Sequence, residues 1–578
     1  MIKKLVRQML LAQILSAMTV SLCLLIDNIM IGRFLGEDAL TAYGLANPVL
    51  MVIGAIGSML CAGVQVACSR SLGRGLQEET NAGYSSAIAV AGIFSAVFMV
   101  LVFIFRVPIA RLMGADDPAM LKETSTYMLG FTIGAPASMA ALILVPFLQM
   151  AGQSNLLIVA VLGMTVADVG LDLLNVLVFK GGMFGMGLAS SLSYYVAMVI
   201  GGAYFLSKKC VFKFSGKLVR WDKIRELVAG GVPTVVAMAS SVVLIFAVNK
   251  MLLPVGGKMA VAAYAVINTL INASNAISTG SGGVALTLSG ILYNEEDGTG
   301  LKQLLGMMLR YAAALGVVVA GLLVIFAPAC VSLFIPNAGP AQTMAINGLR
   351  LFAVGLIPCC LNNTLKNLWQ GAGRVGEMEV VSVLENAILP TLAAFVLSRV
   401  AGVDGAWFLF FAGELLTSLL ILAYVWMKAG KVTTQPEKVL LLSGSFGVPS
   451  EDLLEADIRT KDDVMAFSRR AEAFCKAHGN DPRLANHLAL CIEEMGNNIV
   501  THGFGKGRDN HLLVRLQTKA GHWTLRFRDD CKAFDPVAYV PGEAEQGLGI
   551  KLVMRMADEA RYTYSMNLNN LTLDIRES

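Results

Sequence analysis

Apolar segments of about 20 residues, the length needed to cross the hydrocarbon core of a bilayer as a helix, recur along this chain as far as Trp426. The chain is 56% hydrophobic and only 15% charged, whereas about 25% of the residues in soluble domains are charged. We therefore expect an all-α membrane protein with twelve spans, at about residues 8–33, 43–68, 82–107, 123–150, 155–179, 185–206, 228–253, 260–291, 303–327, 343–370, 378–399 and 404–427.

Lysine and arginine set the expected orientation of these spans, because cytoplasmic loops carry an excess of both residues. They gather at the N-terminus, after the second span, between the sixth and seventh spans (208–225) and after the last span. The basic N-terminus precedes an apolar run too long for a cleaved signal peptide, so we expect the first span to be retained. An even number of spans then places both termini in the cytoplasm, in a multi-pass protein of the cell (inner) membrane.

The two halves of the apolar part resemble each other. NIMIGRFLGEDALTAYGLAN (28–47) aligns with NKMLLPVGGKMAVAAYAVIN (249–268) at an offset of 221 residues, and the same offset aligns LQMAGQ (148–153) with WQGAGR (369–374). Six spans per half give the two halves the same topology, related by an axis along the membrane normal. We expect two six-helix bundles related by pseudo-twofold symmetry, with a substrate path between them.

Acidic residues inside the predicted spans indicate a functional site, because an ionisable group in hydrocarbon costs at least ~2.5 kcal/mol. Asp27 lies near the end of the first span, and Asp168 and Asp172 lie four residues apart, on one face of the fifth. Ser190 and Ser191 of the sixth span could lie near them. A buried carboxylate can bind and release a proton near neutral pH, and several oxygens would suit Na⁺. The alternative is that these aspartates cap helices or face water.

The second half offers weaker candidates. The repeat offset places apolar residues opposite Asp168 and Asp172. Glu385 and Glu414 lie in predicted spans of this half, but each could equally be a residue at the end of a span. We therefore expect the cation site in the first half.

The stretches LIDNIMIGRFLGEDALTAYGLANP and ADVGLDLLNVLVFKGGMFGMGLASSLS resemble the first and the fifth-to-sixth spans of the MATE (multidrug and toxic compound extrusion) transporters. The resemblance covers about residues 1–430, with halves of about 1–215 and 216–430. It implies an antiporter, driven by H⁺ or Na⁺, that exports small amphipathic or cationic compounds. It assigns cation coupling to Asp27, Asp168, Asp172 and Ser190. This chain has Asp168 where the family commonly has asparagine, which leaves the coupling ion open.

The end of the chain has a different composition, with all five histidines after residue 430. We expect a linker at 431–440 and a soluble domain at 441–578. In CIEEMGNNIVTHGF (491–504), Glu494, Asn498 and His502 recur at the four-residue spacing of one helix face. The asparagine could ligate Mg²⁺ and the glutamate could orient or deprotonate a nucleophile. Alone, this pattern is more typical of a solvated helix face.

Two further segments change that interpretation. HLLVRLQTKAGHWTLRFRDD predicts two strands joined by a turn at Ala520–Gly521, the second ending at Asp529, which could accept a hydrogen bond from an adenine amino group. GEAEQGLGIKL predicts a loop with Gly547 and Gly549 before a helix, where backbone N–H groups can approach phosphate.

In this order, the three segments resemble the N, G1 and G2 boxes of the GHKL ATP-binding fold, and most closely its anti-sigma-factor serine kinase branch. The resemblance implies an α/β (α+β) sandwich that binds ATP and Mg²⁺. Cys531 replaces a family glycine, and its Cβ could narrow the pocket or stiffen the loop, which leaves turnover open. The implied roles are catalysis by Glu494, Mg²⁺ binding by Asn498, and nucleotide binding by Asn498, His502, Asp529, Phe534, Gly547 and Gly549.

Two functions remain open at this point. The first is a cation-coupled exporter of drug-like compounds with a regulatory or serine/threonine kinase domain. The second is a membrane sensor whose transporter-like part controls phosphorylation of a partner, such as an anti-anti-sigma-like protein. Transport driven directly by ATP is disfavoured because the chain lacks a G-x-x-x-x-G-K-[ST] loop. The net charge of +4 gives no reason to expect nucleic acid, and the scattered cysteines indicate neither disulfides nor zinc.

Overall fold

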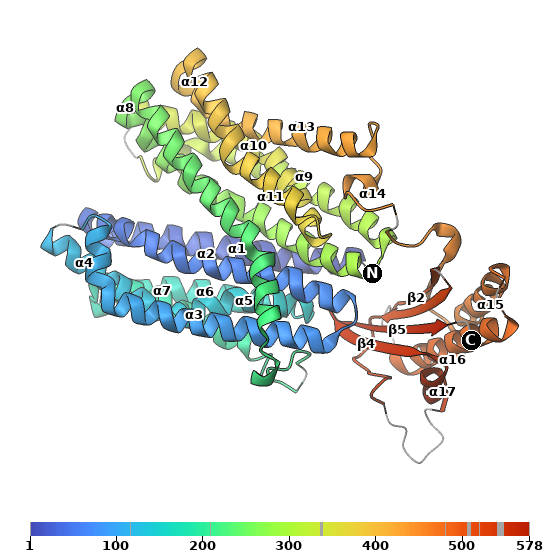
Figure 1. Cartoon of the computed structure of the whole chain (residues 1–578). Helices are drawn as coiled ribbons and strands as arrows, with labels where there is room; N and C mark the ends of the chain where they lie inside the picture. Colours follow the sequence, from blue (N-terminus) through green and yellow to red (C-terminus); the bar gives the residue numbers. More distant parts are fainter. Residues whose placement is uncertain are drawn as a thin grey trace.

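The computed structural model of the chain describes residues 2–115, 117–208, 210–335, 339–444, 446–479, 481–505, 510–519, 521–539 and 548–576. A long helical part is followed by a smaller domain of strands and helices that lies at one end of it (Figure 1). The helices of the first part are α1 (Ile2–Met30), α2 (Glu37–Gly73), α3 (Gln77–Leu112), α4 (Pro118–Thr132), α5 (Ala135–Met150), α6 (Ser154–Leu174), α7 (Gly182–Gly202), α8 (Trp221–Asn294), α9 (Gly298–Ser332), α10 (Pro340–Gly371), α11 (Val375–Val383), α12 (Leu389–Trp407) and α13 (Leu409–Ala429).

Eleven helical segments of the described residues are long and apolar enough to span a membrane, and a twelfth results if α4 and α5, bent by 49°, form one broken span. The predicted helical membrane architecture is therefore confirmed. Helix α8 contains the seventh and eighth spans, which meet at Gly257. Short π-helical turns extend three of the spans, at Ile31–Leu35, Asn175–Phe179 and Leu384–Ile388.

Backbone conformation repeats between the halves at the offset found in the sequence. Gly36 and Gly257 both have positive φ, 97° and 66°, where one helix ends and the next begins. Gly152 and Gly373 have φ of 73° and 80° in the turns after α5 and α10. L-amino acids avoid this left-handed region, and glycine enters it readily. The halves are therefore built with the same breaks at equivalent places.

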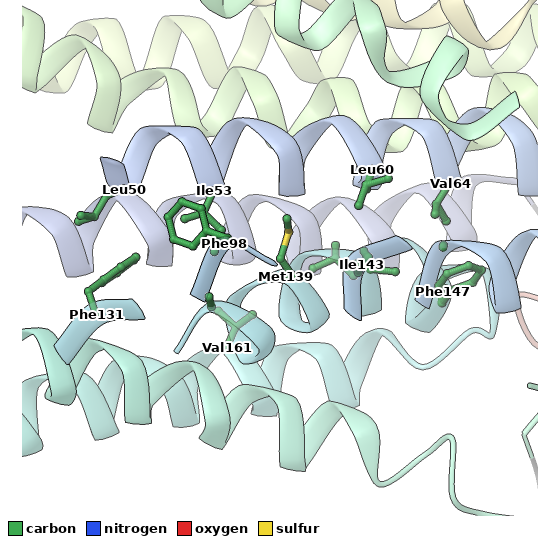
Figure 2. Packing of buried hydrophobic residues seen from close by; sticks show 14 of the residues in the cluster. Leu50, Ile53, Leu60, Val64, Phe98, Phe131, Met139, Ile143, Phe147 and Val161 are labelled. Carbon is green, nitrogen blue, oxygen red and sulfur yellow. The ribbon is translucent and has the colours of Figure 1, made fainter. Parts of the chain in front are cut away.

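Side chains of the spans separate into an inner and an outer set. Figure 2 shows Leu60 and Val64 of α2 facing Ile143 and Phe147 of α5, inside the first bundle. Other large apolar side chains point outward, among them Ile104 of α3 and Phe246 of α8, which are 60% and 71% exposed. In water such a belt would be a costly apolar surface, but in a bilayer it contacts lipid.

The two halves meet at the end that carries the soluble domain. A Cβ on Gly73 of α2 would lie 2.5 Å from the Ile291 carbonyl oxygen of α8. Nearby, Arg74 Nε donates to Asn294 Oδ1 at 3.1 Å. Towards the opposite end the two groups of helices diverge (Figure 1). This structure is therefore closed between the halves on the side of the soluble domain.

The soluble domain is a five-stranded antiparallel sheet in the order β1-β2-β3-β5-β4, with its helices on one face. Strand β2 ends at Lys519 and β3 begins at His522, on either side of the predicted turn at 520–521, of which Ala520 lies outside the described residues. The elements after the membrane part are α14 (Pro436–Val439), β1 (Leu453–Ile458), α15 (Lys461–Ala477), α16 (Pro482–Asn498), β2 (Leu512–Lys519), β3 (His522–Asp529), α17 (Leu548–Met556), β4 (Glu559–Ser565) and β5 (Leu568–Arg576), with short 3₁₀ turns at Gly216–Leu218 and Ser450–Asp452.

Alternate residues of the sheet serve its two faces, since successive side chains of a strand point in opposite directions. One face is apolar and packs against α15, α16 and α17, through residues such as Val514, Leu525 and Leu573, all fully buried. The other face is polar and contains Arg515, Arg526 and Arg528. This second face lies against the helical part of the chain, as the contacts below describe.

Candidate functional site

The acidic residues of the first half come together inside the bundle. Asp27 of α1, and Asp168 and Asp172 of α6, are all buried. Ser190 of α7 donates its hydroxyl to Asp27 Oδ2 at 3.1 Å. The carboxyl groups of Asp27 and Asp172 are neighbours inside the bundle, close enough for their charges to interact. Three helices therefore assemble the residues that the sequence analysis selected.

The cluster contains more acceptors than donors. Among the described residues, four buried carboxylate oxygens have no hydrogen-bond partner: Asp27 Oδ1, Asp168 Oδ2 and both oxygens of Asp172. Buried polar atoms are normally satisfied, and adjacent buried carboxylates cannot all remain charged without compensation. The arrangement therefore needs protons or a cation.

Some neighbours of the cluster were not anticipated. Cys23 and Ser193 lie near Asp168, and the Ser193 hydroxyl donates to the Ser190 carbonyl oxygen at 2.8 Å. Ser191 has a different place from the one expected. Its hydroxyl donates to the carbonyl oxygen of Gly130 at 2.7 Å and accepts from the N–H of Gly134 at 2.9 Å, so it stabilises the bend between α4 and α5.

The second half contains a charged network of its own. Lys366 of α10 forms a buried ion pair with Glu385. Asn362 donates to Glu414 Oε2 at 3.0 Å and accepts from Ser418 at 2.8 Å. Glu385 and Glu414 thus have partners inside the bundle, which argues against the interpretation that they are residues at span ends. Lys366 could have been selected from the sequence, because a lysine within an apolar span is rare.

The Lys366–Glu385 pair gives a stability prediction. Lys366→Met should lower the free energy of unfolding by about 3–5 kcal/mol, because it leaves a buried carboxylate without its partner. Lys366→Met combined with Glu385→Gln should recover most of the loss. Lys302→Met is the matched control, since it breaks the exposed pair with Glu437, worth about 0–1 kcal/mol. Thermal unfolding of the purified chain in detergent measures all three, and equal melting temperatures for the two single variants would refute the prediction.

In the soluble domain, the candidate catalytic glutamate lies beside the second glycine segment. A Cβ on Gly549 of α17 would lie 2.0 Å from Oε2 of Glu494, a residue of α16. The side chains of Glu494 and Asn498 are both partly buried in the last two turns of α16. A π-helical turn (Ile499–Gly503) follows, so the four-residue helical register does not extend to His502, which is exposed.

Asp529 lies at the end of β3 and is held in a network of hydrogen bonds. Asn569 Nδ2 donates to its Oδ1 at 2.7 Å, and the Cys531 N–H donates to the same oxygen at 3.0 Å. Burial raises the pKa of Asp529 above its ordinary value, and these donors oppose the rise. A carboxylate accepts about four hydrogen bonds, so Asp529 keeps capacity for a donor on a ligand.

The loop after Asp529 accommodates the cysteine that replaces the family glycine. Cys531 is buried, and its Sγ lies 3.0 Å from the position that a Cβ on Gly503 would occupy. The thiol thus packs against Gly503. Phe534 follows, with its N–H donating to Asn569 Oδ1 at 3.1 Å and its ring half exposed beside Tyr539. Gly547, the remaining predicted nucleotide contact, lies outside the described residues.

This set of donors and acceptors fits a nucleotide bound with Mg²⁺. Asn498 offers an amide oxygen, a ligand that Mg²⁺ accepts alongside phosphate oxygens and water. The first turn of α17 offers backbone N–H groups, the usual partners of phosphate. Asp529 offers a buried acceptor for an amino group. When bound, the nucleotide would supply a phosphoryl group for transfer or hydrolysis, and Glu494 would be the group to orient an attacking hydroxyl.

Comparison with known sequences agrees with both parts. The MatE family profile matches residues 12–174 and 233–396, and the profile described as Histidine kinase-like ATPase domain matches residues 459–575. The chain is 24% identical over 431 residues to the probable multidrug resistance protein YoeA of Bacillus subtilis (strain 168), which covers 70% of this chain and 90% of that relative. It is 25% identical over 228 residues to a FAD transporter of Shewanella oneidensis, which covers 38% of this chain and 50% of the relative.

Solved structures with the same fold are MATE transporters. A crystal structure of MATE in complex with MaL6 has a TM-score of 0.67 at 18% identity and covers 72% of this chain and 94% of that one. An outward-facing multidrug resistance MATE family transporter of the MOP superfamily has a TM-score of 0.66 at 19% identity, with the same coverage. The chain therefore belongs to the MatE family of membrane transporters, and it carries a histidine kinase-like (GHKL-type) ATPase domain after its transporter part.

Proposed function

We propose that this chain is a cation-coupled antiporter that exports small amphipathic or cationic compounds, with Asp27, Asp168, Asp172 and Ser190 as its coupling site. The observation that carries the proposal is the set of four buried carboxylate oxygens without partners among the described residues. A site with excess buried negative charge binds a cation strongly and releases it when a competing positive charge or a change of exposure offsets that charge.

The coupling cycle follows from this electrostatics. Binding of H⁺ or Na⁺ reduces the negative charge of the cluster, and the two halves can then change their relative position. When the cation leaves, the negative charge favours binding of a cationic or amphipathic substrate in the path between the halves. Because Asp168 adds a carboxylate to the Asp27–Asp172 pair, the cluster can hold more than one proton, or one Na⁺ with a proton.

A transport assay separates the two coupling ions. Ethidium efflux should be measured in proteoliposomes with an imposed pH gradient, with an imposed Na⁺ gradient, and with Mg-ATP but no gradient. We expect one of the two ion gradients to drive efflux, and Mg-ATP alone to fail. Efflux driven by Mg-ATP without any ion gradient would contradict the proposal.

We also propose that residues 441–578, joined through a linker at 431–440, form a cytoplasmic domain that binds Mg-ATP. Asn498 would hold Mg²⁺, Asp529 and Phe534 would contact the base, and Gly549 would contact phosphate. The N-terminus lies at the same end of the molecule as this domain (Figure 1), which supports a common cytoplasmic side for both termini. Mg-ATP here would regulate the transporter or serve a kinase.

Kinase activity is a separate candidate, favoured by the position of Glu494 beside Gly549. The purified chain with radiolabelled ATP should phosphorylate a serine or threonine of a small anti-anti-sigma-like protein encoded nearby. Glu494→Gln should abolish phosphotransfer and leave Mg-ATP binding largely intact, whereas Glu493→Gln, the neighbouring change, should have no effect. Equal phosphotransfer by wild type and Glu494→Gln would exclude a catalytic role for Glu494. Absence of phosphotransfer by the wild type would exclude the kinase, and the sensor function with it.

A further inference from the structure

The polar face of the sheet is bound to the second half of the transporter by charge. Arg515 Nη2 donates to Asp297 Oδ1 at 2.8 Å, and Arg528 pairs with Glu295. These four side chains are buried. Burial by itself would raise the pKa of Asp297, but Arg515, the Gly300 N–H and Arg528 outweigh it and hold that pKa below its ordinary value. We call Glu295–Asp297 and the arginines of this face the anchor.

The anchor is specific to one half. At the repeat offset, Glu295, Glu296 and Asp297 correspond to Arg74, Gly75 and Leu76 of the turn between α2 and α3. Glu296 and Gly75 even share the left-handed conformation, with φ of 52° and 72°. The equivalent turn thus has the same shape and lacks the acids. Of the two turns, therefore, Glu295–Asp297 alone carries the negative charge that complements the arginines of the anchor.

The same domain also contacts the first half, through the turn between β4 and β5 and through Arg561 of β4, whose Nη1 donates to the Arg74 carbonyl oxygen at 3.5 Å. The Met566 N–H donates to the Met150 carbonyl oxygen at 2.6 Å, and Asn567 Nδ2 donates to the Gly152 carbonyl oxygen at 2.8 Å. Met566 and Asn567 both have positive φ, 55° and 60°. We call this turn the latch. It rests on two hydrogen bonds, and no ion pair is recorded for it among the described residues, so it is the weaker attachment.

Anchor and latch together bridge the two halves at the end where those halves are closed. Alternating access requires the halves to move relative to each other. Movement that opens this end separates Gly152 of the first half from Glu295 of the second. A domain that holds both must lose one contact. We expect the latch to break first, because its hydrogen bonds cost less free energy to break than the buried ion pairs of the anchor.

The latch is also connected to the candidate nucleotide site through a few residues of β5. Asn569 binds Asp529, which faces the candidate site, and the next residue, Asn570, accepts from Arg528 Nε at 2.6 Å. Arg528 and Asp529 are successive residues of β3, so their side chains point to opposite faces of the sheet. We expect a shift at Asp529 to reach the anchor through Arg528, the preceding residue of β3. We expect it to reach the latch through Asn569, which lies two residues after Asn567.

We propose that the ATPase-like domain is a clamp, anchored on the second half through Glu295–Asp297 and latched to the first half through Met566–Asn567, which holds the transporter closed on its own side and is released or tightened by nucleotide. The nucleotide step rests on the proposed ATP site. The mechanical step does not, because the contacts that form the clamp involve no ligand.

Disulfide cross-linking of Arg74→Cys with Asn294→Cys reports closure of this end, since the two native side chains are in contact across the halves. The rate is measured in the full chain in liposomes, with the 74–294 link identified by mass spectrometry. Gly152→Ala should slow cross-linking by about 3- to 10-fold, which corresponds to the loss of one or two hydrogen bonds. The reason is that the new Cβ would lie 2.6 Å from the Asn567 nitrogen. Asn567→Gly keeps the turn and removes one hydrogen bond, so it should also slow cross-linking.

Gly373→Ala is the matched control. It has the same left-handed strain at the repeat-equivalent position, but among the described residues its Cβ would meet only Tyr293, at 3.8 Å. Equal rates for Gly152→Ala and Gly373→Ala, or an unchanged rate for Asn567→Gly, would overturn the clamp.

Mg-ATP then tests the nucleotide step, with its binding measured separately. It should change the cross-linking rate when the latch is intact and leave it unchanged in Asn567→Gly. Bound Mg-ATP without any change of rate in the intact chain would overturn the link to nucleotide. Absence of Mg-ATP binding would refute the proposed ATP site, and the clamp would then be judged on the nucleotide-free comparison.

Discussion

Asp172→Asn is expected to reduce gradient-driven ethidium efflux to the level of vesicles without the protein. Asp172 is buried with both carboxylate oxygens unpartnered among the described residues, and Asp27 is one of its charged neighbours. Asparagine keeps the size of the side chain and can neither bind a proton nor contribute negative charge to a Na⁺ site. Because the change removes charge from a site that needs compensation, the variant should fold at least as well as the wild type.

Asp38→Asn is the matched control for this experiment. Asp38 lies in α2 at an exposed position, a short distance along the chain from Asp27. Its replacement should leave efflux unchanged under the same gradient. Both variants should elute like the wild type in gel filtration, and wild-type efflux by Asp172→Asn would remove the acidic cluster from the coupling mechanism.

The second large effect is expected at the nucleotide site. Asn498→Ala should weaken Mg-ATP binding to the purified chain by about 10- to 100-fold, the range seen when groups that support a metal site are lost. It should also abolish the difference between binding with Mg²⁺ and binding with a chelator. The physical reason is that the amide oxygen of Asn498 is the proposed protein ligand of Mg²⁺, while Asp529 and α17 act on other parts of the nucleotide.

Asn497→Ala provides the comparison, as the same change one residue earlier on α16. Because neighbouring residues of a helix point in different directions, it should leave binding within about twofold of wild type, a difference of about 0.4 kcal/mol. Calorimetric titration with Mg-ATP measures both variants. Mg²⁺-dependent binding that survives Asn498→Ala would place the metal ligand elsewhere.

Much of the fold could be predicted because its signals are periodic. Apolar spans recur at bilayer length, and the repeat offset of 221 residues also aligns Gly36 with Gly257 and Gly152 with Gly373, pairs that share left-handed backbone. The acidic residues of the first half could be selected from the sequence, since a carboxylate in an apolar span is conspicuous. Its assembly from α1, α6 and α7 required the three-dimensional packing.

Other features depend on contacts between distant residues, which a single sequence does not encode locally. Ser191 looked like a neighbour of the aspartates and instead binds the bend at Gly134. Glu385 looked like a residue at a span end until Lys366, 19 residues earlier, proved to be its partner. The role of the acidic turn Glu295–Asp297 has no local signal in the sequence, because its partners are arginines more than 200 residues away.

The most direct test of ion-coupled export is whether substrate and cation displace each other on the purified protein. Ethidium added to the full chain in detergent should release protons, measured as a pH change in weak buffer, or release bound radioactive Na⁺. The account predicts release in the wild type and none in Asp172→Asn. Saturable ethidium binding by the wild type without release of either ion would contradict it.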